Sequence, residues 1–370
     1  MSKILFIIPS LAKGGAERLV IDICNELKLR IGIEVKLIIF KDVNEYSFMT
    51  KDINIQVIKS YNIPSITGKS QIDVTELQDQ IELFKPTIIH SHLFESELVL
   101  NAIKYNSCKY FVHFHDNMKQ FNNLSLKTFK SKIAITDYYV KKKVLKGYLK
   151  RNTSFIAIST DSFNFIKKTI PITFAKNLLY NAINLNRFST QNTSRDINRI
   201  VIIGSLVNKK GQDLAIETIK ILHTRNISAH LDILGDGPDF EILQNLIDSH
   251  HLSNFITLHG NVDHPETFLS EASIYLHTAI YEPFGLVLIE AMALGLPVVC
   301  TDAKGNRDII QEGINGFMIK DRNPNLIADK IELLIYDPKL WNSMSRNGVE
   351  ISKKYDISLY VDKLLDIYQL

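Results

Sequence analysis

Short apolar runs alternate with amphipathic segments along almost the whole chain. The apolar runs predict buried strands at 3–9, 35–40, 87–92, 110–115, 155–159, 199–206, 231–237, 256–260, 274–279 and 297–302. Segments with apolar residues at helical spacing predict helices between them, for example at 16–30, 211–226, 238–251 and 286–294. Strands that alternate with helices form parallel sheets covered on both faces. The pattern therefore predicts an α/β fold.

One polar segment interrupts this alternation. Residues 184–198 lack helical periodicity and precede a new strand, which predicts a linker between a domain at 1–183 and a domain at 199–354. The chain is long enough for two domains of ordinary size. The final segment, 356–370, is amphipathic and is predicted to be helical.

Composition narrows the class of protein. The net charge of +3 is too small to indicate a nucleic-acid partner, and the three cysteines are odd in number and far apart, as expected in a reducing compartment. The first apolar run is too short for a signal peptide, and no apolar run approaches the roughly 20 residues that cross a bilayer. We expect a cytoplasmic protein, or one on the inner face of a membrane.

The segment YEPFGLVLIEAMALGLPVVC, residues 281–300, carries the clearest chemistry. Glu282 and Glu290 flank a Pro-Phe-Gly turn and the start of a short helix. A helix N-terminus offers unpaired N–H groups to a phosphate, and carboxylates accept hydrogen bonds from sugar hydroxyls. A nucleotide sugar has both kinds of group.

Two further turns could meet such an anion. Gly14 and Gly15 follow the first strand and open a helix, although they do not form the G-x-G-x-x-G pattern of dinucleotide dehydrogenases. Lys209 and Lys210 precede Gly211 in the turn after the first strand of the second domain. A fixed cation there would stabilise a leaving diphosphate.

The pattern E-P-F-G-x-x-x-x-E-A-x-x-x-G-x-P-V-V resembles the signature of glycosyltransferase family 4, whose members are retaining enzymes of the GT-B fold. The resemblance implies two Rossmann-like parallel-sheet domains that face each other across a cleft. The first domain would bind the acceptor and the second the nucleotide sugar. The helix at 356–370 would pack back on the first domain.

The resemblance also implies a role for individual residues. Lys210 would meet the donor diphosphate, Glu282 the hydroxyls of the transferred sugar, Glu290 the ribose, and His115 the reacting sugar and acceptor. Ser205 stands where the family often has an arginine, so Lys209, another cation or helix-end N–H groups would carry more of the charge. The implied donor-binding set is Gly14, Gly15, Ser205, Lys210, Val262, Phe284, Gly285, Leu286, Val287 and Glu290. Gly305 and Arg307 either line the same pocket or belong to an ordinary surface loop.

Two pairs of histidines end two predicted strands. His90 and His92 share one strand face, as do His113 and His115, so neighbouring strands would bring four imidazoles together. A transition-metal site is one interpretation; a packed core position is the other, above all for His90. The chain lacks a D-x-D pair and GT-B enzymes are generally metal-independent, so we expect no metal and no cofactor.

The stretch 119–151 is rich in lysine and contains interspersed aromatic residues. Such a composition suits an anionic membrane surface, or it is the solvated face of a helix. No nucleic-acid-binding module accompanies it.

Together these features predict a retaining glycosyltransferase. It would move a hexose or N-acetylhexosamine from a nucleoside diphosphate sugar, most readily a UDP-sugar, to a hydroxyl of a saccharide or lipid-linked glycan in cell-surface polysaccharide synthesis. The alternatives are a sugar-nucleotide epimerase of the same fold and a non-catalytic nucleotide-sugar-binding protein.

Overall fold

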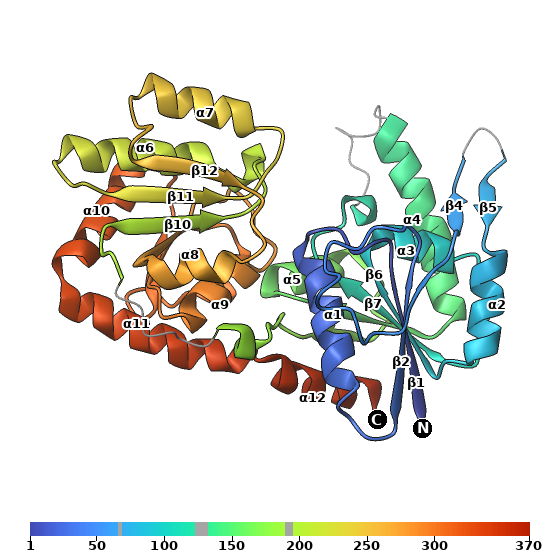
Figure 1. Cartoon of the computed structure of the whole chain (residues 1–370). Coiled ribbons are helices and arrows are strands. Elements are labelled where there is room, and N and C mark those ends of the chain that lie inside the picture. Colours follow the sequence, from blue (N-terminus) through green and yellow to red (C-terminus); the bar gives the residue numbers. More distant parts are fainter. Residues whose placement is uncertain (66–68, 123–131, 189–194) are drawn as a thin grey trace. The chain divides into compact units, whose positions relative to one another are not determined.

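The computed structural model describes residues 1–65, 69–122, 132–188 and 195–370. Within them the chain forms two compact units, one made of Met1–Ala182 with Ile357–Leu370 and the other of Ile183–Asp356 (Figure 1). The described parts of the expected linker, 184–188 and 195–198, belong to the second unit.

A seven-stranded parallel sheet forms the centre of the first unit, in the order β3-β2-β1-β6-β7-β8-β9. Its strands are β1 (Ser2–Ile8), β2 (Ile33–Ile39), β3 (Ile55–Val57), β6 (Ile88–His92), β7 (Lys109–Phe114), β8 (Thr153–Ala157) and β9 (Lys176–Leu178). A separate antiparallel pair is formed by β4 (Tyr61–Ile63) and β5 (Gln71–Asp73). The α-helices of this unit are α1 (Gly15–Leu27), α2 (Thr75–Phe84), α3 (Leu93–Leu100), α4 (Lys132–Lys150), α5 (Thr160–Thr169) and α12 (Ile357–Tyr368), and η1 (Lys119–Phe121) is a 3₁₀ turn.

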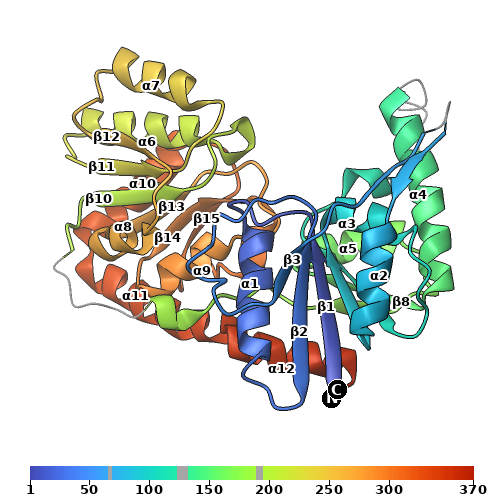
Figure 2. The same ribbon diagram turned by 45° about the vertical axis from the view of Figure 1, so that its right-hand side comes forward.

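Both faces of this sheet are covered, which explains why β1 is apolar from Ile4 to Ile8. Ile4, Phe6 and Ile8 of β1 pack on one side, and Leu5 and Ile7 pack on the other. The C-terminal helix α12 lies alongside α1 and buries its apolar stripe in the same core as Phe6 (Figures 1 and 2). The final helix is therefore part of the first unit, although it follows the second in sequence.

The second unit contains a six-stranded parallel sheet in the order β12-β11-β10-β13-β14-β15. Its strands are β10 (Arg199–Ile203), β11 (His230–Leu234), β12 (Ile256–Gly260), β13 (Ile274–His277), β14 (Val298–Thr301) and β15 (Gly316–Ile319). Its α-helices are α6 (Gln212–Thr224), α7 (Phe240–Ser249), α8 (Pro265–Glu271), α9 (Leu286–Ala293), α10 (Pro324–Tyr336) and α11 (Pro338–Ser352). Short 3₁₀ turns are η2 (Leu185–Phe188), η3 (Asn208–Lys210), η4 (Gly305–Asp308) and η5 (Lys353–Tyr355).

The predicted α/β class with parallel sheets is confirmed. The sequence did not predict the short strands β3, β4, β5, β9 and β15, and the other differences lie at the ends of elements. The strand expected at 231–237 ends at Leu234, because Gly235 turns out of the sheet with φ +133°. Local chemistry fixes several helix starts. Asn323 and Asp337 accept backbone N–H bonds as N-caps of α10 and α11, and each precedes a proline at the first helical position.

Among the described residues, no helix combines the length and the hydropathy that a bilayer span requires.

Candidate functional site

The order of the second sheet places two loops together. The chain leaves β10 toward β11 on one side, and β13 lies on the other side of β10, so the sheet changes winding direction between β10 and β13. Ligands of such sheets bind beyond the carboxyl ends of the strands at this switch point. The loop after β10 carries Lys210, and the loop after β13 carries Glu282.

These two side chains are in contact. The Lys210 Nζ lies 2.6 Å from the Glu282 Oε2, and only a fifth of the lysine and a tenth of the glutamate side chain are exposed. Close backbone packing sets up the contact. Gly211 has φ +66°, and a Cβ there would lie 2.4 Å from the carbonyl oxygen of Thr278. A glycine at 211 therefore lets the Lys210 turn approach the end of β13.

His277, the last residue of β13, is a third member of this cluster. Its Nε2 lies 3.4 Å from the Glu282 Oε2, and its side chain is buried. Burial raises the pKa of Glu282, but the close approach of His277 and the charge of Lys210 lower it more, to about 2. Glu282 is therefore an ionised acceptor at neutral pH. We did not predict His277 from the sequence; its signal is a polar residue at the carboxyl end of a buried strand.

The turn that follows Glu282 begins α9. Gly285 has φ +101°, which favours glycine, and the helix starts at Leu286. The N–H groups at such a start have no acceptor within the helix, so those of Leu286 and Val287 are positioned for an anion. Glu290 lies one turn into α9 and is buried. Burial raises the pKa of Tyr275 on β13, and the charges of Glu282 and Glu290 raise it further. The structure thus gathers both predicted glutamates around β13.

The other predicted donor-site residues of the second unit lie in loops that follow neighbouring strands of this sheet. Gly305 approaches the Glu282 loop so closely that a Cβ would lie 2.5 Å from the Glu282 carbonyl oxygen. Ser205 is exposed, and its carbonyl oxygen accepts a hydrogen bond from the Gln212 side chain. Val262 is half-buried just after β12. The Arg307 guanidinium is bound to Asp302.

The first unit has its own switch point, between β1 and β6. Gly14 and Gly15 lie after β1, where α1 begins. The Tyr46 hydroxyl accepts a hydrogen bond from the Gly14 N–H and donates one to the Gly14 carbonyl oxygen. Tyr46 therefore holds the glycine turn in place, a role that the sequence did not reveal.

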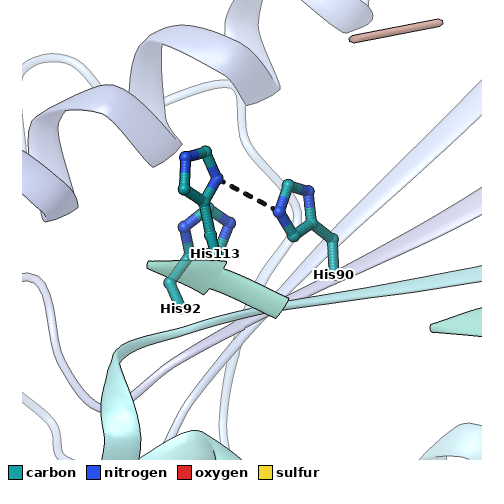
Figure 3. Close-up of side chains that lie close together, drawn as sticks. All are labelled: His90, His92 and His113. Atoms are coloured by element: carbon teal, nitrogen blue, oxygen red, sulfur yellow. Dashed lines mark hydrogen bonds between the residues drawn. The ribbon is translucent and has the colours of Figure 1, made fainter. Parts of the chain in front are cut away.

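The histidine strands are neighbours, as the metal interpretation required. β6 and β7 pair in parallel, and the rings of His90, His92 and His113 lie 4.4–5.1 Å apart between centroids (Figure 3). One nitrogen from each of these three side chains lies within 4.8 Å of the other two. All three are fully buried.

Hydrogen bonds already link these rings. The His113 Nδ1 lies 3.2 Å from the His90 Nε2, and the His90 Nδ1 lies 2.5 Å from the Tyr368 hydroxyl of α12. An ion held by His90 through Nε2 would displace His113. Burial lowers the pKa of His90 and of His115 to about 3, so both rings are neutral at physiological pH.

The basic stretch is described only in part, since 123–131 lie outside the described residues. Its described portion is mainly α4, on which Ile135, Tyr139, Lys142, Lys146 and Leu149 are exposed. Their spacing of three and four residues places them along one side of the helix.

Comparison with known proteins agrees with this geometry. Residues 186–350 match the family described as glycosyl transferases group 1. The match covers nearly the whole second unit.

An uncharacterized glycosyltransferase of Methanocaldococcus jannaschii is 28% identical over 235 residues, which cover 61% of this chain and 65% of that protein. The poly(glycerol-phosphate) alpha-glucosyltransferase of Bacillus subtilis is 30% identical over 165 residues, 44% of this chain and 24% of that protein. The chain thus spans less than two thirds of the length of either relative.

A solved structure matches over the full length. Anabaena HepE in complex with UDP and glucose has a TM-score of 0.79 and 19% identity, with 100% of both chains covered. The likeness shows that the chain has the GT-B fold.

Proposed function

We propose that this protein is a retaining glycosyltransferase of the family 4 type. It transfers a hexose or N-acetylhexosamine from a UDP-sugar to a hydroxyl of a saccharide or lipid-linked glycan. The observation that carries the proposal is the contact between Lys210 and Glu282 at the switch point of the second sheet. It lies within the segment that matches the group 1 glycosyl transferases. The Anabaena protein of the same fold was crystallised with UDP and glucose, which favours a UDP-linked donor.

In this proposal the second unit holds the donor. Lys210 and the first N–H groups of α9 bind the diphosphate, which gains negative charge as the glycosidic bond breaks. A cation fixed in place stabilises that transition state more than the ground state. The lysine is already held by Glu282, so little reorganisation is needed when the charge develops.

The carboxylates accept hydrogen bonds from the donor. Glu282 is ionised and faces the hydroxyls of the transferred sugar, while Glu290 accepts from the ribose. A carboxylate with a pKa of about 2 is a weak base, so Glu282 orients the sugar and does not remove the acceptor proton. His115 contacts the reacting sugar and acceptor, and the acceptor attacks from the face that the diphosphate leaves.

We also propose that no divalent ion takes part, since Lys210 and the helix N-terminus supply the positive charge. Chelation of divalent ions with EDTA is then expected to leave the rate of transfer unchanged. A loss of activity that Mg²⁺ or Mn²⁺ restores would contradict this assignment.

The α4 surface suits an acceptor held at an anionic membrane. Lys142 and Lys146 lie on the same side of the helix as the exposed Ile135, Tyr139 and Leu149. Lysines with interfacial apolar side chains bind anionic lipid. The protein should sediment with phosphatidylglycerol vesicles and not with phosphatidylcholine vesicles, and K142A/K146A should weaken that binding. Equal sedimentation with both lipids would oppose the assignment.

The function is tested by incubating the protein with UDP-glucose or UDP-N-acetylglucosamine, with and without octyl glycosides as acceptors. UDP released only with acceptor, together with a product of retained anomeric configuration, supports transfer. A changed sugar without acceptor would indicate an epimerase. Binding without either reaction would indicate a non-catalytic binder.

A further inference from the structure

A hydrogen bond joins the candidate active-site histidine to a buried neighbour. The His92 Nδ1 lies 2.8 Å from the His115 Nε2. We propose that His92 is a positioning residue that fixes the tautomer of His115, so that His115 presents its Nδ1–H as a hydrogen-bond donor to a ligand oxygen. The inference rests on the proposed function, in which His115 contacts the transferred sugar or the acceptor.

The number of N–H groups on the two rings limits the tautomers that they can adopt. Burial lowers the pKa of both rings, so each is neutral and carries one N–H. Their shared hydrogen bond uses one N–H and one lone pair. Two ring nitrogens remain, the His92 Nε2 and the His115 Nδ1, and neither has a hydrogen-bond partner among the described residues.

Only two arrangements satisfy this count. In the first, the His92 Nδ1–H donates to the His115 Nε2, and the unpaired N–H is the Nδ1–H of His115. In the second, the His115 Nε2–H donates to His92, and the unpaired N–H is the Nε2–H of His92. The choice between them depends on which ring leaves an N–H without a partner at lower cost.

Burial favours the first arrangement. His92 is 0% exposed and His115 is 8% exposed. A buried N–H without a partner is more costly than a lone pair without one, and orphaned N–H groups are rarer than under-satisfied acceptors. Both nitrogens are buried, but the His115 residue reaches the surface and His92 does not, so an N–H on His115 needs the smaller movement to meet a ligand. The unpaired N–H is therefore placed on His115 and the bare lone pair on the deeper His92.

Packing keeps His92 in this orientation. Its backbone lies on β6 between β1 and β7, and its ring packs against Phe6, His90 and His113 at centroid distances of 5.9, 4.4 and 5.0 Å. His90 in turn is bound to Tyr368 and His113. A ring enclosed in this way cannot turn to another partner, so the tautomer of His115 is set before any ligand arrives.

The direct test is NMR of protein labelled with ¹⁵N-histidine, in EDTA at pH 7.5, because protonated and bare ring nitrogens differ widely in ¹⁵N shift. The His115 signals are assigned by their loss in His115→Gln. We expect a protonated Nδ1 and a bare Nε2. A protonated Nε2 in the wild-type protein would overturn the proposal. This readout needs no turnover, so the failure of the tautomer assignment and the failure of the transferase proposal are separate results.

Two variants test the role of His92. In His92→Asn, an amide near the position of Nδ1 can still donate to His115; in His92→Leu, nothing can. We expect His92→Asn to keep the His115 tautomer and most of kcat. His92→Leu should lose the tautomer and about tenfold or more of kcat, with the donor KM nearly unchanged.

Circular dichroism and thermal unfolding check that the first unit, which contains His92, stays folded in both variants, and UDP binding checks the second unit. A His92→Leu protein that keeps both the His115 tautomer and kcat would contradict the inference. If His92→Leu does not fold, the ¹⁵N spectra of the wild-type protein and of His92→Asn still test the inference. A protonated Nε2 of His115 in either protein would contradict it.

Discussion

Glu282 shows how three side chains set one ionisation state. Burial opposes a charge, yet the neighbouring His277 and the charge of Lys210 hold the pKa of Glu282 at about 2. The sequence motif predicted the glutamate but not its partners. Lys210 lies 72 residues earlier in the chain, and only the strand order brings it to the end of β13. His277 belongs to no part of the motif that we identified.

The Glu282 contact contributes stability that depends on pH. Its folded pKa lies below the ordinary 4.5, so the stabilisation is complete above about pH 4.5 and is lost as the pH falls toward 2. The pH-dependent part is about 3 kcal/mol at neutral pH. In urea unfolding, the difference between wild type and Glu282→Gln should be constant from pH 7 to 5 and shrink below that. Glu241→Gln, at an exposed position on α7, should show no such dependence. A difference that grows in acid would contradict the assignment.

The catalytic assignment of Lys210 can be tested with its exposed neighbour Lys209 as the control position. Lys210→Ala removes the cation that faces Glu282 and should lower kcat by about 10²–10³-fold, the cost of losing one fixed charge at a developing anion. Lys209 is exposed beside it, and Lys209→Ala should change kcat less than twofold. Steady-state UDP release measures both. Equal losses would show that Lys210 has no special role.

At the scale of elements, the long apolar strands and the motif-bearing turns could be predicted, and the short edge strands could not. β1 and β10 were predicted because near-continuous burial leaves near-continuous apolar sequence. β3 and β9 have three residues each and no such signal. They form because the neighbouring strand offers unpaired backbone groups, which is a property of the assembled sheet.

Two glycines at strand ends of the second unit allow the cost of a positive φ to be measured separately from the cost of a steric clash. Gly260 has φ +67° with nothing near a Cβ, whereas Gly235 has φ +133° and a Cβ would lie 2.1 Å from the Gly204 carbonyl oxygen. Gly260→Ala should cost about 1 kcal/mol of unfolding free energy. Gly235→Ala should cost at least about 2 kcal/mol more, since β10 must also move. Urea unfolding curves measure the loss of unfolding free energy in each variant. Similar losses in the two would contradict the close approach of the two strands.

At the scale of the whole molecule, four buried neutral histidines make the first unit sensitive to acid. The depressed pKa values mean that the unfolded chain binds protons at these positions below about pH 6.5, while in the folded unit His90 and His115 stay neutral until near pH 3 and burial lowers the pKa of His92 and His113 as well. The stabilisation from these neutral rings is thus fully present above pH 6.5 and is lost progressively as the pH falls below that value. The sequence predicted the grouping of these residues, provided that the strands were neighbours, but not the hydrogen bonds that join them.

Removal of one buried histidine should flatten this acid dependence. Between pH 6 and 4.5, His90→Gln should reduce the slope of unfolding free energy against pH by about 1.4 kcal/mol per pH unit, the value for one proton. His264→Gln, which changes a side chain that is 74% exposed, should leave the slope as it is. Identical slopes for wild type and His90→Gln would mean that His90 is protonated in the folded protein.

The central claim is that a nucleoside diphosphate binds at the β10–β13 edge of the second sheet. Hydrogen-exchange mass spectrometry with and without saturating UDP tests it most directly, because it locates the ligand on the chain. Slower exchange should concentrate in 204–213, 282–290 and 303–308, and Lys210→Ala should weaken the effect. UDP that protects only other segments, or none, would contradict the account.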